Sequence, residues 1–230
     1  MVDAKLTFII PTIGRDSLQF TIDSILKQTC PEWKAIIVFD GIEPTLNPDD
    51  PRIQIIQSPK LEFGKNRPTG AGHVRNYGIK HATTEWIGFV DDDDTITQNY
   101  IECFLEEMQN NGFDLIIFRM GRVFVNVGGG GIVNISPSPD ANNFIKCDVG
   151  ISFAVKKSIF DSGIVFETSE YEDFEFLEKV RKNNNKMIIS PYTLYIIRNY
   201  FVDINVPLAN TRVFINFPVC VQTLTSGRMC

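Results

Sequence analysis

The sequence predicts an α/β protein with a mostly parallel sheet flanked by helices in a single domain. Apolar runs of strand length alternate with segments of helical periodicity, a pattern typical of sheets with parallel strands. The chain has 230 residues, of which 43% are hydrophobic and 22% charged, which is enough for one sizeable core. Residues 60–69 lack this periodicity, and the pattern weakens from residue 200 onward.

The first half of the chain alternates strands with two helices. Leu18, Ile22 and Ile25 recur at the spacing of one helix face, and Pro11 and Gly14 interrupt regular structure just before them. We therefore predict strands at 5–10, 33–39, 53–57 and 86–90, helices at 16–26 and 72–82, and a turn at 11–15. This order favours parallel pairing of the strands, with short loops at their carboxyl ends.

The second half contains three further helices and a glycine-rich hairpin. The four glycines at 128–131 stand between β-branched residues, which favours a hairpin tip, and no Lys-Ser/Thr pair follows them as in a phosphate-binding loop. We predict helices at 100–109, 157–161 and 172–182, strands at 115–119, 152–155, 186–190 and 194–198, and the hairpin at 123–135.

Charge and composition exclude several classes of protein. The net charge of -6 and the pI near 5.0 argue against a chain that coats nucleic acid or an anionic membrane. No stretch approaches the ~20 apolar residues of a membrane span, so we expect a cytoplasmic protein. The five cysteines form no CxxC pair and are interpreted as reduced structural thiols. His73 and His81 form no metal-binding trio, and we interpret both as structural or surface residues.

Four consecutive aspartates, Asp91–Asp94, directly follow the apolar stretch Trp86–Val90. Such carboxylates repel one another, and a buried strand gains nothing from ending in them unless a cation or a row of donors receives them. No Cys or His lies beside the run, which suits Mg²⁺ or Mn²⁺, and Mg²⁺ takes its remaining ligands from water and substrate phosphates. The alternative is a solvated loop that caps a helix starting near Thr97.

Further polar residues are expected at the same edge of the sheet, because ligands gather at the carboxyl ends of parallel strands. Pro11 and Thr12 follow the first predicted strand, and Asp40 follows the second. Asp40 either forms a turn with Gly41 or accepts a hydrogen bond from a nucleobase. Arg75, on the next predicted helix, is a candidate cationic contact, although arginines at such positions are more often surface residues.

A second acidic site, Glu172–Asp173, lies at the start of the predicted helix 172–182. Clustered carboxylates raise one another's pKa, and a carboxylate held near a substrate hydroxyl can act as a general base. Acidic residues are also common at helix N-termini for purely structural reasons, so both interpretations stay open.

Eight short stretches form an ordered series along the chain. They are 8–12 (FIIPT), 24–29 (SILKQT), 37–41 (IVFDG), 72–79 (GHVRNYGI), 86–94 (WIGFVDDDD), 163–167 (GIVFE), 171–176 (YEDFEF) and 195–198 (YIIR). Together these stretches resemble family 2 glycosyltransferases, which have the nucleotide-binding GT-A (Rossmann-like) fold. The resemblance covers about residues 5 to 200 in the family's order.

The resemblance implies a role for each matching position. It implies catalytic roles for Asp173, as the base, and for the neighbouring Glu172. The implied nucleotide contacts are Pro11, Thr12, Arg15, Asp40, Arg75 and Asp92. The implied metal ligands are Asp91, Asp93 and Asp94. The family's Asp-x-Asp motif corresponds best to Asp91 and Asp93, with a register that is open by one residue.

The implied activity is metal-dependent, inverting transfer of a sugar from a nucleotide-diphospho-sugar, usually a UDP-sugar, with Mn²⁺ or Mg²⁺ as cofactor. The implied acceptor is a hydroxyl of a carbohydrate or glycolipid, as in polysaccharide biosynthesis. Residues 1–200 are then the catalytic domain, and residues 201–230 a cap, acceptor loop or contact segment of the same domain. We expect no nucleic-acid partner and no membrane span, and a homodimer stays open.

One departure from the family and two other functions limit these expectations. Residues 65–71 replace the family's shorter glycine and asparagine stretch, which puts the donor-sugar contacts in question. A sugar nucleotidyltransferase usually has a glycine-rich loop and a basic residue after its first strand, where this chain has PTIGR at 11–15. A non-catalytic nucleotide-sugar-binding module or assembly partner would keep the fold but would not need both acidic sites.

Overall fold

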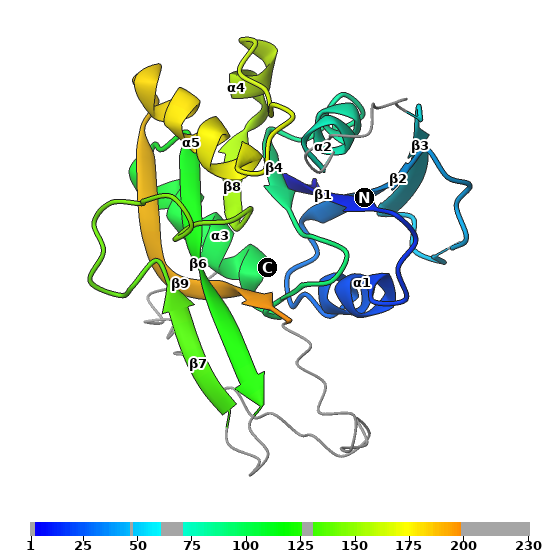
Figure 1. Cartoon of the computed structure of the whole chain (residues 1–230), viewed down its shortest axis with the longest axis horizontal. Helices are drawn as coiled ribbons and strands as arrows, with labels where there is room; N and C mark the ends of the chain where they lie inside the picture. Colours follow the sequence, from blue (N-terminus) through cyan, green and yellow to red (C-terminus); the bar gives the residue numbers. More distant parts are fainter. Residues whose placement is uncertain (1–2, 47, 61–70, 126–130, 199–230) are drawn as a thin grey trace.

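A computed structural model describes residues 3–46, 48–60, 71–125 and 131–198, and within them nine strands form one mixed sheet with helices on both faces (Figure 1). The strands are β1 (Leu6–Thr12), β2 (Trp33–Asp40), β3 (Ile53–Ser58), β4 (Trp86–Phe89), β5 (Thr95–Ile96), β6 (Leu115–Val125), β7 (Gly131–Ser136), β8 (Phe153–Lys156) and β9 (Met187–Ile197). The helices are α1 (Leu18–Leu26), α2 (Ala71–Ile79), α3 (Tyr100–Asn111), α4 (Lys157–Asp161) and α5 (Glu172–Lys182).

The sheet has the order β3-β2-β1-β4-β8-β6-β9-β5, and β7 pairs with β6 in the predicted hairpin. The neighbours β3, β2, β1 and β4 are all parallel, and β9 runs parallel to β6. Only β8, β7 and β5 run against this direction among the described strands. The predicted mostly parallel α/β architecture is therefore confirmed.

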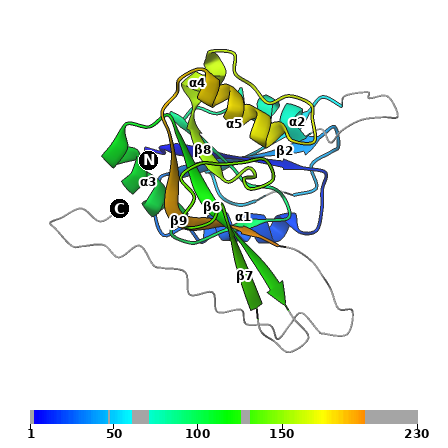
Figure 2. The same cartoon turned by 60° about the vertical axis from the view of Figure 1, so that its left-hand side comes forward.

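The two faces of the sheet are covered by different helices. Figure 2 shows α2, α4 and α5 on one face and α1 and α3 on the other. Phe89 of β4 packs against Phe166 on the first face, and Trp86, on the same strand, packs against Phe104 of α3 on the second. Because side chains alternate along a strand, β4 is buried on both sides. Gly78 brings α2 close to the sheet, since a Cβ there would lie 2.8 Å from Ile9 Cγ2.

Two details of the predicted secondary structure differ from the fold. Pro11 and Thr12 do not form a turn but end β1, where they pair with Val38 and Phe39 of the parallel neighbour β2. The two predicted strands at 186–190 and 194–198 are one strand, β9, whose pairing with β6 shifts register around Pro191. Such an irregularity accommodates a residue without a backbone N–H, which explains why the sequence pattern looks broken there.

Some predicted features lie outside the described residues. They are the tip of the hairpin at 126–130, most of the stretch 65–71 that departs from the family, and the segment 201–230. Among the residues that the structure describes, no helix is long and apolar enough to cross a membrane.

The strand order places the predicted polar residues at one edge of the sheet. The chain moves from β1 outward through β2 to β3 and then returns to the other side of β1 with β4. Thr12, Asp40 and Asp91 stand at or just after the carboxyl ends of β1, β2 and β4. This reversal of strand order is where open α/β sheets bind ligands.

Candidate active site

A cavity of about 530 Å³ opens at this edge of the sheet. All the residues that the sequence proposes for catalysis, nucleotide binding or metal binding line it: Pro11, Thr12, Arg15, Asp40, Arg75, Asp91, Asp92, Asp93, Asp94, Glu172 and Asp173. They come from β1, β2, α2, α5 and the segments after β1 and β4. The fold thus brings together side chains that are up to 162 positions apart, from Pro11 to Asp173.

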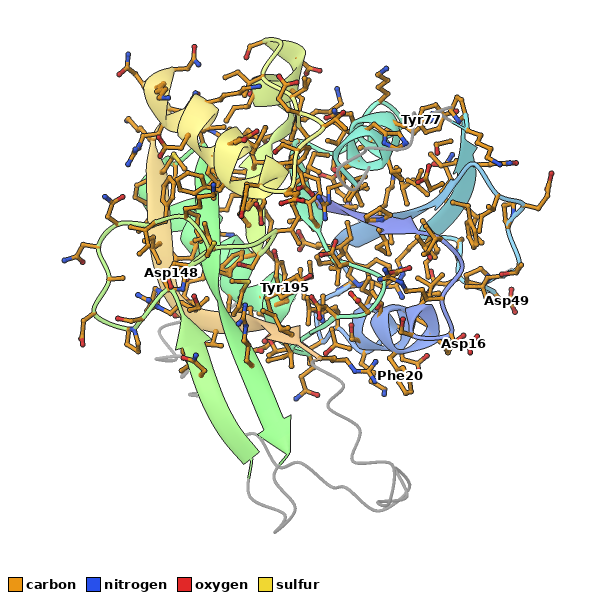
Figure 3. The ribbon with its side chains drawn as sticks, viewed as in Figure 1. Asp16, Phe20, Asp49, Tyr77, Asp148 and Tyr195 are labelled. Carbon is orange, nitrogen blue, oxygen red and sulfur yellow. The ribbon has the colours of Figure 1, made fainter. Side chains whose placement is uncertain are left out.

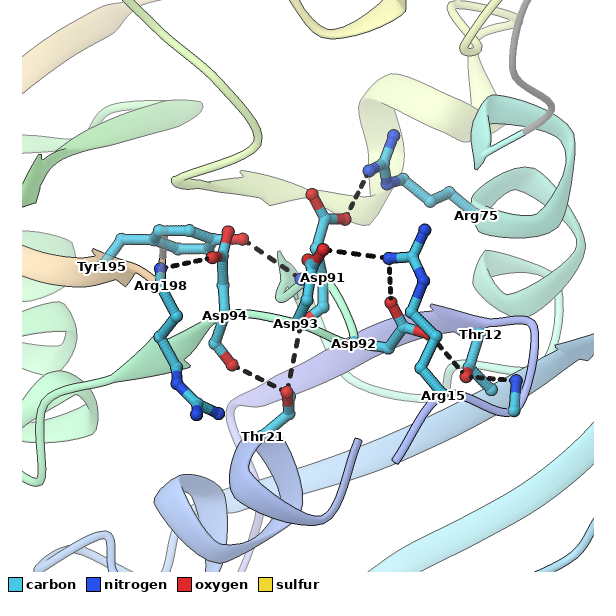
Figure 4. A network of polar contacts seen from close by, with 11 residues as sticks. Thr12, Arg15, Thr21, Arg75, Asp91, Asp92, Asp93, Asp94, Tyr195 and Arg198 are labelled. Atoms are coloured by element: carbon cyan, nitrogen blue, oxygen red, sulfur yellow. Dashed lines mark hydrogen bonds and ion pairs between the residues drawn. The ribbon is translucent and has the colours of Figure 1, made fainter. Parts of the chain in front are cut away.

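One end of the cavity is a hydrogen-bonded cluster around Asp92. Thr12 Oγ1 donates to Asp92 Oδ2 at 2.7 Å, and Arg15 Nη1 donates to Asp92 Oδ1 and Asp93 Oδ2, both at 2.9 Å (Figure 4). The side chain of Asp92 is only 6% exposed, whereas that of Asp93 is 45% exposed. Asp92 is therefore fixed by the protein itself, and Asp93 faces the open cavity.

The backbone of the acidic run is fixed from two sides. Thr21 Oγ1 of α1 donates to the carbonyl oxygen of Asp94 at 2.7 Å, and the backbone N–H of Asp91 donates to Tyr195 Oη at 3.1 Å. Figure 3 shows Tyr195 in the interior of the molecule, and its side chain is buried. Burial raises the pKa of Asp94 to about 7, against the hydrogen bond from the Arg198 backbone N–H, which lowers it. Asp94 thus faces the protein.

Arg75 links the two acidic sites that the sequence identifies. Its Nη2 donates to Asp91 Oδ1 and its Nη1 to Glu172 Oε1, each at 2.6 Å, and the arginine is 3% exposed. Burial alone would lower the pKa of Arg75, but the two carboxylates outweigh it and raise that pKa above its usual value. The guanidinium is therefore a permanent positive charge between Asp91 and Glu172.

Asp173 follows Glu172 in the first turn of α5, at the end of this bridge opposite Asp91. Its Oδ1 accepts the backbone N–H of Phe174 at 2.6 Å, and no other hydrogen bond to its carboxylate is present within the described chain. Burial raises the pKa of Asp173 to about 6. Gly150 lies beside this carboxylate, since a Cβ there would be in van der Waals contact with Asp173 Oδ2, at 3.8 Å, and would crowd Met120 Sδ, at 3.1 Å. One carboxylate oxygen of Asp173 is thus available to a ligand.

The helix that carries Arg75 is held in place by contacts that the sequence does not reveal. Asn76 Nδ2 donates to the carbonyl oxygen of Phe166, and the Phe166 N–H donates to Asn76 Oδ1, at 2.8 and 3.1 Å. Asn76 therefore fixes α2 to the segment before α5, instead of offering its amide to a nucleotide. A Cβ at Gly72 would lie 2.5 Å from the carbonyl oxygen of Glu167, so glycine is required where these segments meet.

The structure argues against the helix-capping interpretation of the acidic run. Helix α3 begins at Tyr100 with Asn99 at its N-cap position, so the run ends too early to cap it. The expected positive charge is supplied within the chain by Arg15 and Arg75. Glu172 and Asp173 do stand in the first turn of α5, and this position is compatible with both interpretations of that pair.

The accessible carboxylates of the run fit a hard divalent cation. Asp91 and Asp93 have side chains that are 35% and 45% exposed, and both line the cavity. No group of three or more His, Cys, Asp or Glu side chains within the described residues has the geometry of a complete metal site. A pair of carboxylates is nevertheless sufficient for Mg²⁺ when substrate phosphates and water complete its coordination.

Comparison with known proteins gives a consistent result. The family model described as Glycosyl transferase family 2 matches residues 7–202. The glucosyltransferase WfgD of Escherichia coli is 26% identical over 195 residues, covering 80% of this chain and 73% of that protein. The N-acetylglucosaminyltransferase TarP of Staphylococcus aureus is 29% identical over 221 residues, covering 87% of this chain and 65% of that protein.

Solved structures give the fold. The crystal structure of Staphylococcus aureus TarS residues 1–349 in complex with UDP-GlcNAc has a TM-score of 0.61 and 20% identity, and the match covers 84% of this chain and 58% of that one. At this identity the likeness concerns the fold alone, which is the predicted GT-A fold.

An uncharacterized glycosyltransferase of Rickettsia bellii is 30% identical over 113 residues, which is 16% of its length. The chain thus spans from a sixth to three quarters of these proteins.

The bridge formed by Arg75 is testable through stability. Arg75→Met leaves Asp91 and the buried Glu172 as uncompensated like charges, so we expect the free energy of unfolding to fall by about 3–5 kcal/mol at pH 7.5. The loss should shrink at pH 5.5, because the unpaired carboxyls take up protons more readily in the folded state than in the unfolded state. Urea denaturation at both pH values measures these quantities.

Arg15→Met is the matched control. Arg15 also contacts two carboxylates, but its side chain is 48% exposed, so we expect a loss of at most about 1 kcal/mol. Equal, small losses for the two variants would show that Arg75 does not hold the acidic sites together.

Proposed function

The chain belongs to glycosyltransferase family 2, and we propose that it transfers a sugar from a nucleoside diphosphate sugar, with UDP as the nucleotide, to a hydroxyl of a carbohydrate or glycolipid. One observation carries the proposal: two kinds of aspartate line a single cavity. Asp91 and Asp93 are accessible carboxylates of the acidic run, and Asp173, next to the Glu172 that pairs with Arg75, has one carboxylate oxygen available. Two similar proteins support the choice of nucleotide: WfgD is named as a glucosyltransferase that uses UDP-Glc, and TarS was crystallised in complex with UDP-GlcNAc.

The donor would bind across the edge of β1, β2 and β4. Asp40 and Thr12 stand nearest the base and ribose in this proposal, and the diphosphate would lie over the acidic run. Asp91 and Asp93 would hold Mn²⁺ or Mg²⁺ there. Such an ion supplies Lewis-acid stabilisation of the charge that develops on the departing diphosphate. Arg15 would keep Asp92 in place and so maintain the shape of this end of the cavity.

Asp173 would act as the general base. The acceptor hydroxyl would approach Asp173 Oδ2 from the cavity, which Gly150 also lines. Asp173 takes the hydroxyl proton while the oxygen bonds to C1 of the sugar and the bond from C1 to the diphosphate oxygen breaks. The products are the glycosylated acceptor and UDP, and this single displacement inverts the anomeric carbon. A raised pKa makes Asp173 a stronger base than an exposed aspartate.

Donor binding can be tested without knowledge of the acceptor. We expect UDP-sugars to raise the melting temperature of the protein, and Mn²⁺ to enlarge the increase, because a ligand that binds only the folded state stabilises it. A panel of uridine, guanosine and thymidine diphosphate sugars with and without Mn²⁺ measures this. Flat responses to the whole panel would refute donor binding. Binding with neither hydrolysis nor transfer would instead indicate a non-catalytic module.

The role of Asp173 is testable with Asp173→Asn. The amide still accepts the Phe174 N–H but cannot take a proton, so we expect turnover to fall by about 10²–10⁴ while the affinity for UDP is retained. The wild-type rate should rise with pH and level off above about 6, where Asp173 is ionised. Turnover assays and UDP titrations measure both quantities.

The same variant separates catalysis from stability. Because burial holds the pKa of Asp173 in the folded protein above its usual value of 3.8, its contribution to stability is present below pH 3.8 and is lost as the pH rises through about 6. Asp173→Asn should therefore be at least as stable as the wild type at pH 7.5. A variant that unfolds more easily would contradict the raised pKa of Asp173, and a variant that keeps near-normal turnover would contradict its role as the base.

A further inference from the structure

Asp40 is held by a histidine that the proposed reaction does not use. His73 Nε2 lies 3.2 Å from Asp40 Oδ1, and Asp40 lines the cavity while its side chain is 30% exposed. His73 is on the first turn of α2, two residues before Arg75, and its side chain is 16% exposed. The histidine thus lies behind the carboxylate, and Asp40 lies between it and the ligand space.

The direction of this hydrogen bond follows from chemistry. An ionised carboxylate only accepts hydrogen bonds, so His73 Nε2 must carry a hydrogen whenever the pair is formed, in either protonation state of the ring. Asp40 Oδ1 is then occupied by the protein. No hydrogen bond to Asp40 Oδ2 is present among the residues that the structure describes, which leaves this oxygen for a ligand.

Both partners are attached to fixed backbone. Asp40 is the last residue of β2, and Gly41 after it has a φ of +64° and packs so closely on Lys60 that a Cβ would lie 2.7 Å away. Helix α2 is fixed by the double hydrogen bond of Asn76 to Phe166. The His73 ring therefore constrains the Asp40 side chain relative to the sheet.

We infer that His73 is a positioning residue that fixes Asp40 so that Oδ2 reads one N–H group of the donor nucleobase. This inference rests on the proposed function, since it needs a nucleotide in the cavity. Uracil offers an N–H at ring position 3, whereas cytosine offers a lone pair there and an amino group one atom further round. A fixed carboxylate oxygen distinguishes these bases, because it accepts a hydrogen bond from the N–H of uracil and is repelled by the lone pair of cytosine at the same ring position. A carboxylate free to rotate would reach the amino group of cytosine.

The test is the affinity of the full chain for UDP and CDP, measured by calorimetric titration. Wild type should prefer UDP. For His73→Ala we expect UDP binding to weaken roughly 5- to 10-fold and the UDP-to-CDP affinity ratio to fall by a similar factor. His73→Gln, whose amide can still donate to Asp40, should restore most of the ratio. At saturating donor, turnover should stay close to the wild-type value in both variants.

His81→Gln is the matched control, because His81 lies beyond the end of α2, is exposed and contacts Tyr77. It should leave both affinities unchanged, and melting temperatures identify any variant that fails to fold. Unchanged affinities in His73→Ala, or an equal loss for UDP and CDP, would overturn the inference while leaving the proposed function intact. A wild type that binds no uridine nucleotide would overturn both.

Discussion

The ion-pair bridge from Asp91 through Arg75 to Glu172 is the interaction on which the candidate site depends. Without it, the segment after β4 and the start of α5 would face each other as like charges around one cavity. Arg75 is nearly fully buried, and it can hold both carboxylates because its helix, α2, is itself fixed. Asn76 fixes α2 on one side, and the close approach of Gly78 to β1 and β2 fixes it on the other. In the proposed function, the bridge lies between the carboxylates that meet the diphosphate and the aspartate that meets the acceptor hydroxyl.

The four aspartates after β4 have four different environments, and this difference is functionally informative. Asp92 and Asp94 are buried and serve the protein, the first with Thr12 and Arg15 and the second with the Arg198 backbone. Asp91 and Asp93 remain accessible. Burial and the charge of Asp91 raise the pKa of Asp93, as expected for a carboxylate in a crowded acidic site. A run of identical residues thus contains a structural pair and a pair that can meet a ligand.

Much of the fold could be predicted from the sequence, because hydrophobic periodicity and turn residues mark the strands and helices locally. The common edge of β1, β2 and β4 followed from their parallel order. The contacts that arrange the site could not be predicted from the sequence, because their partners are far apart in it. Arg75 and Glu172 are 97 positions apart, and Thr12 and Asp92 are 80 positions apart. Two arginines of the chain itself supply the positive charge near the acidic run. His73 looked structural because nothing in its local sequence points to Asp40.

The central claim is that Asp173 activates a hydroxyl on the face of the sugar opposite the diphosphate. The anomeric configuration of the first sugar released from an α-linked UDP-sugar tests it most directly, because water can replace the acceptor. Proton NMR during the first minutes of donor hydrolysis, before the free sugar equilibrates, gives that configuration. The account predicts the β-anomer as the initial product. Initial release of the α-anomer would contradict a single displacement with Asp173 as the base.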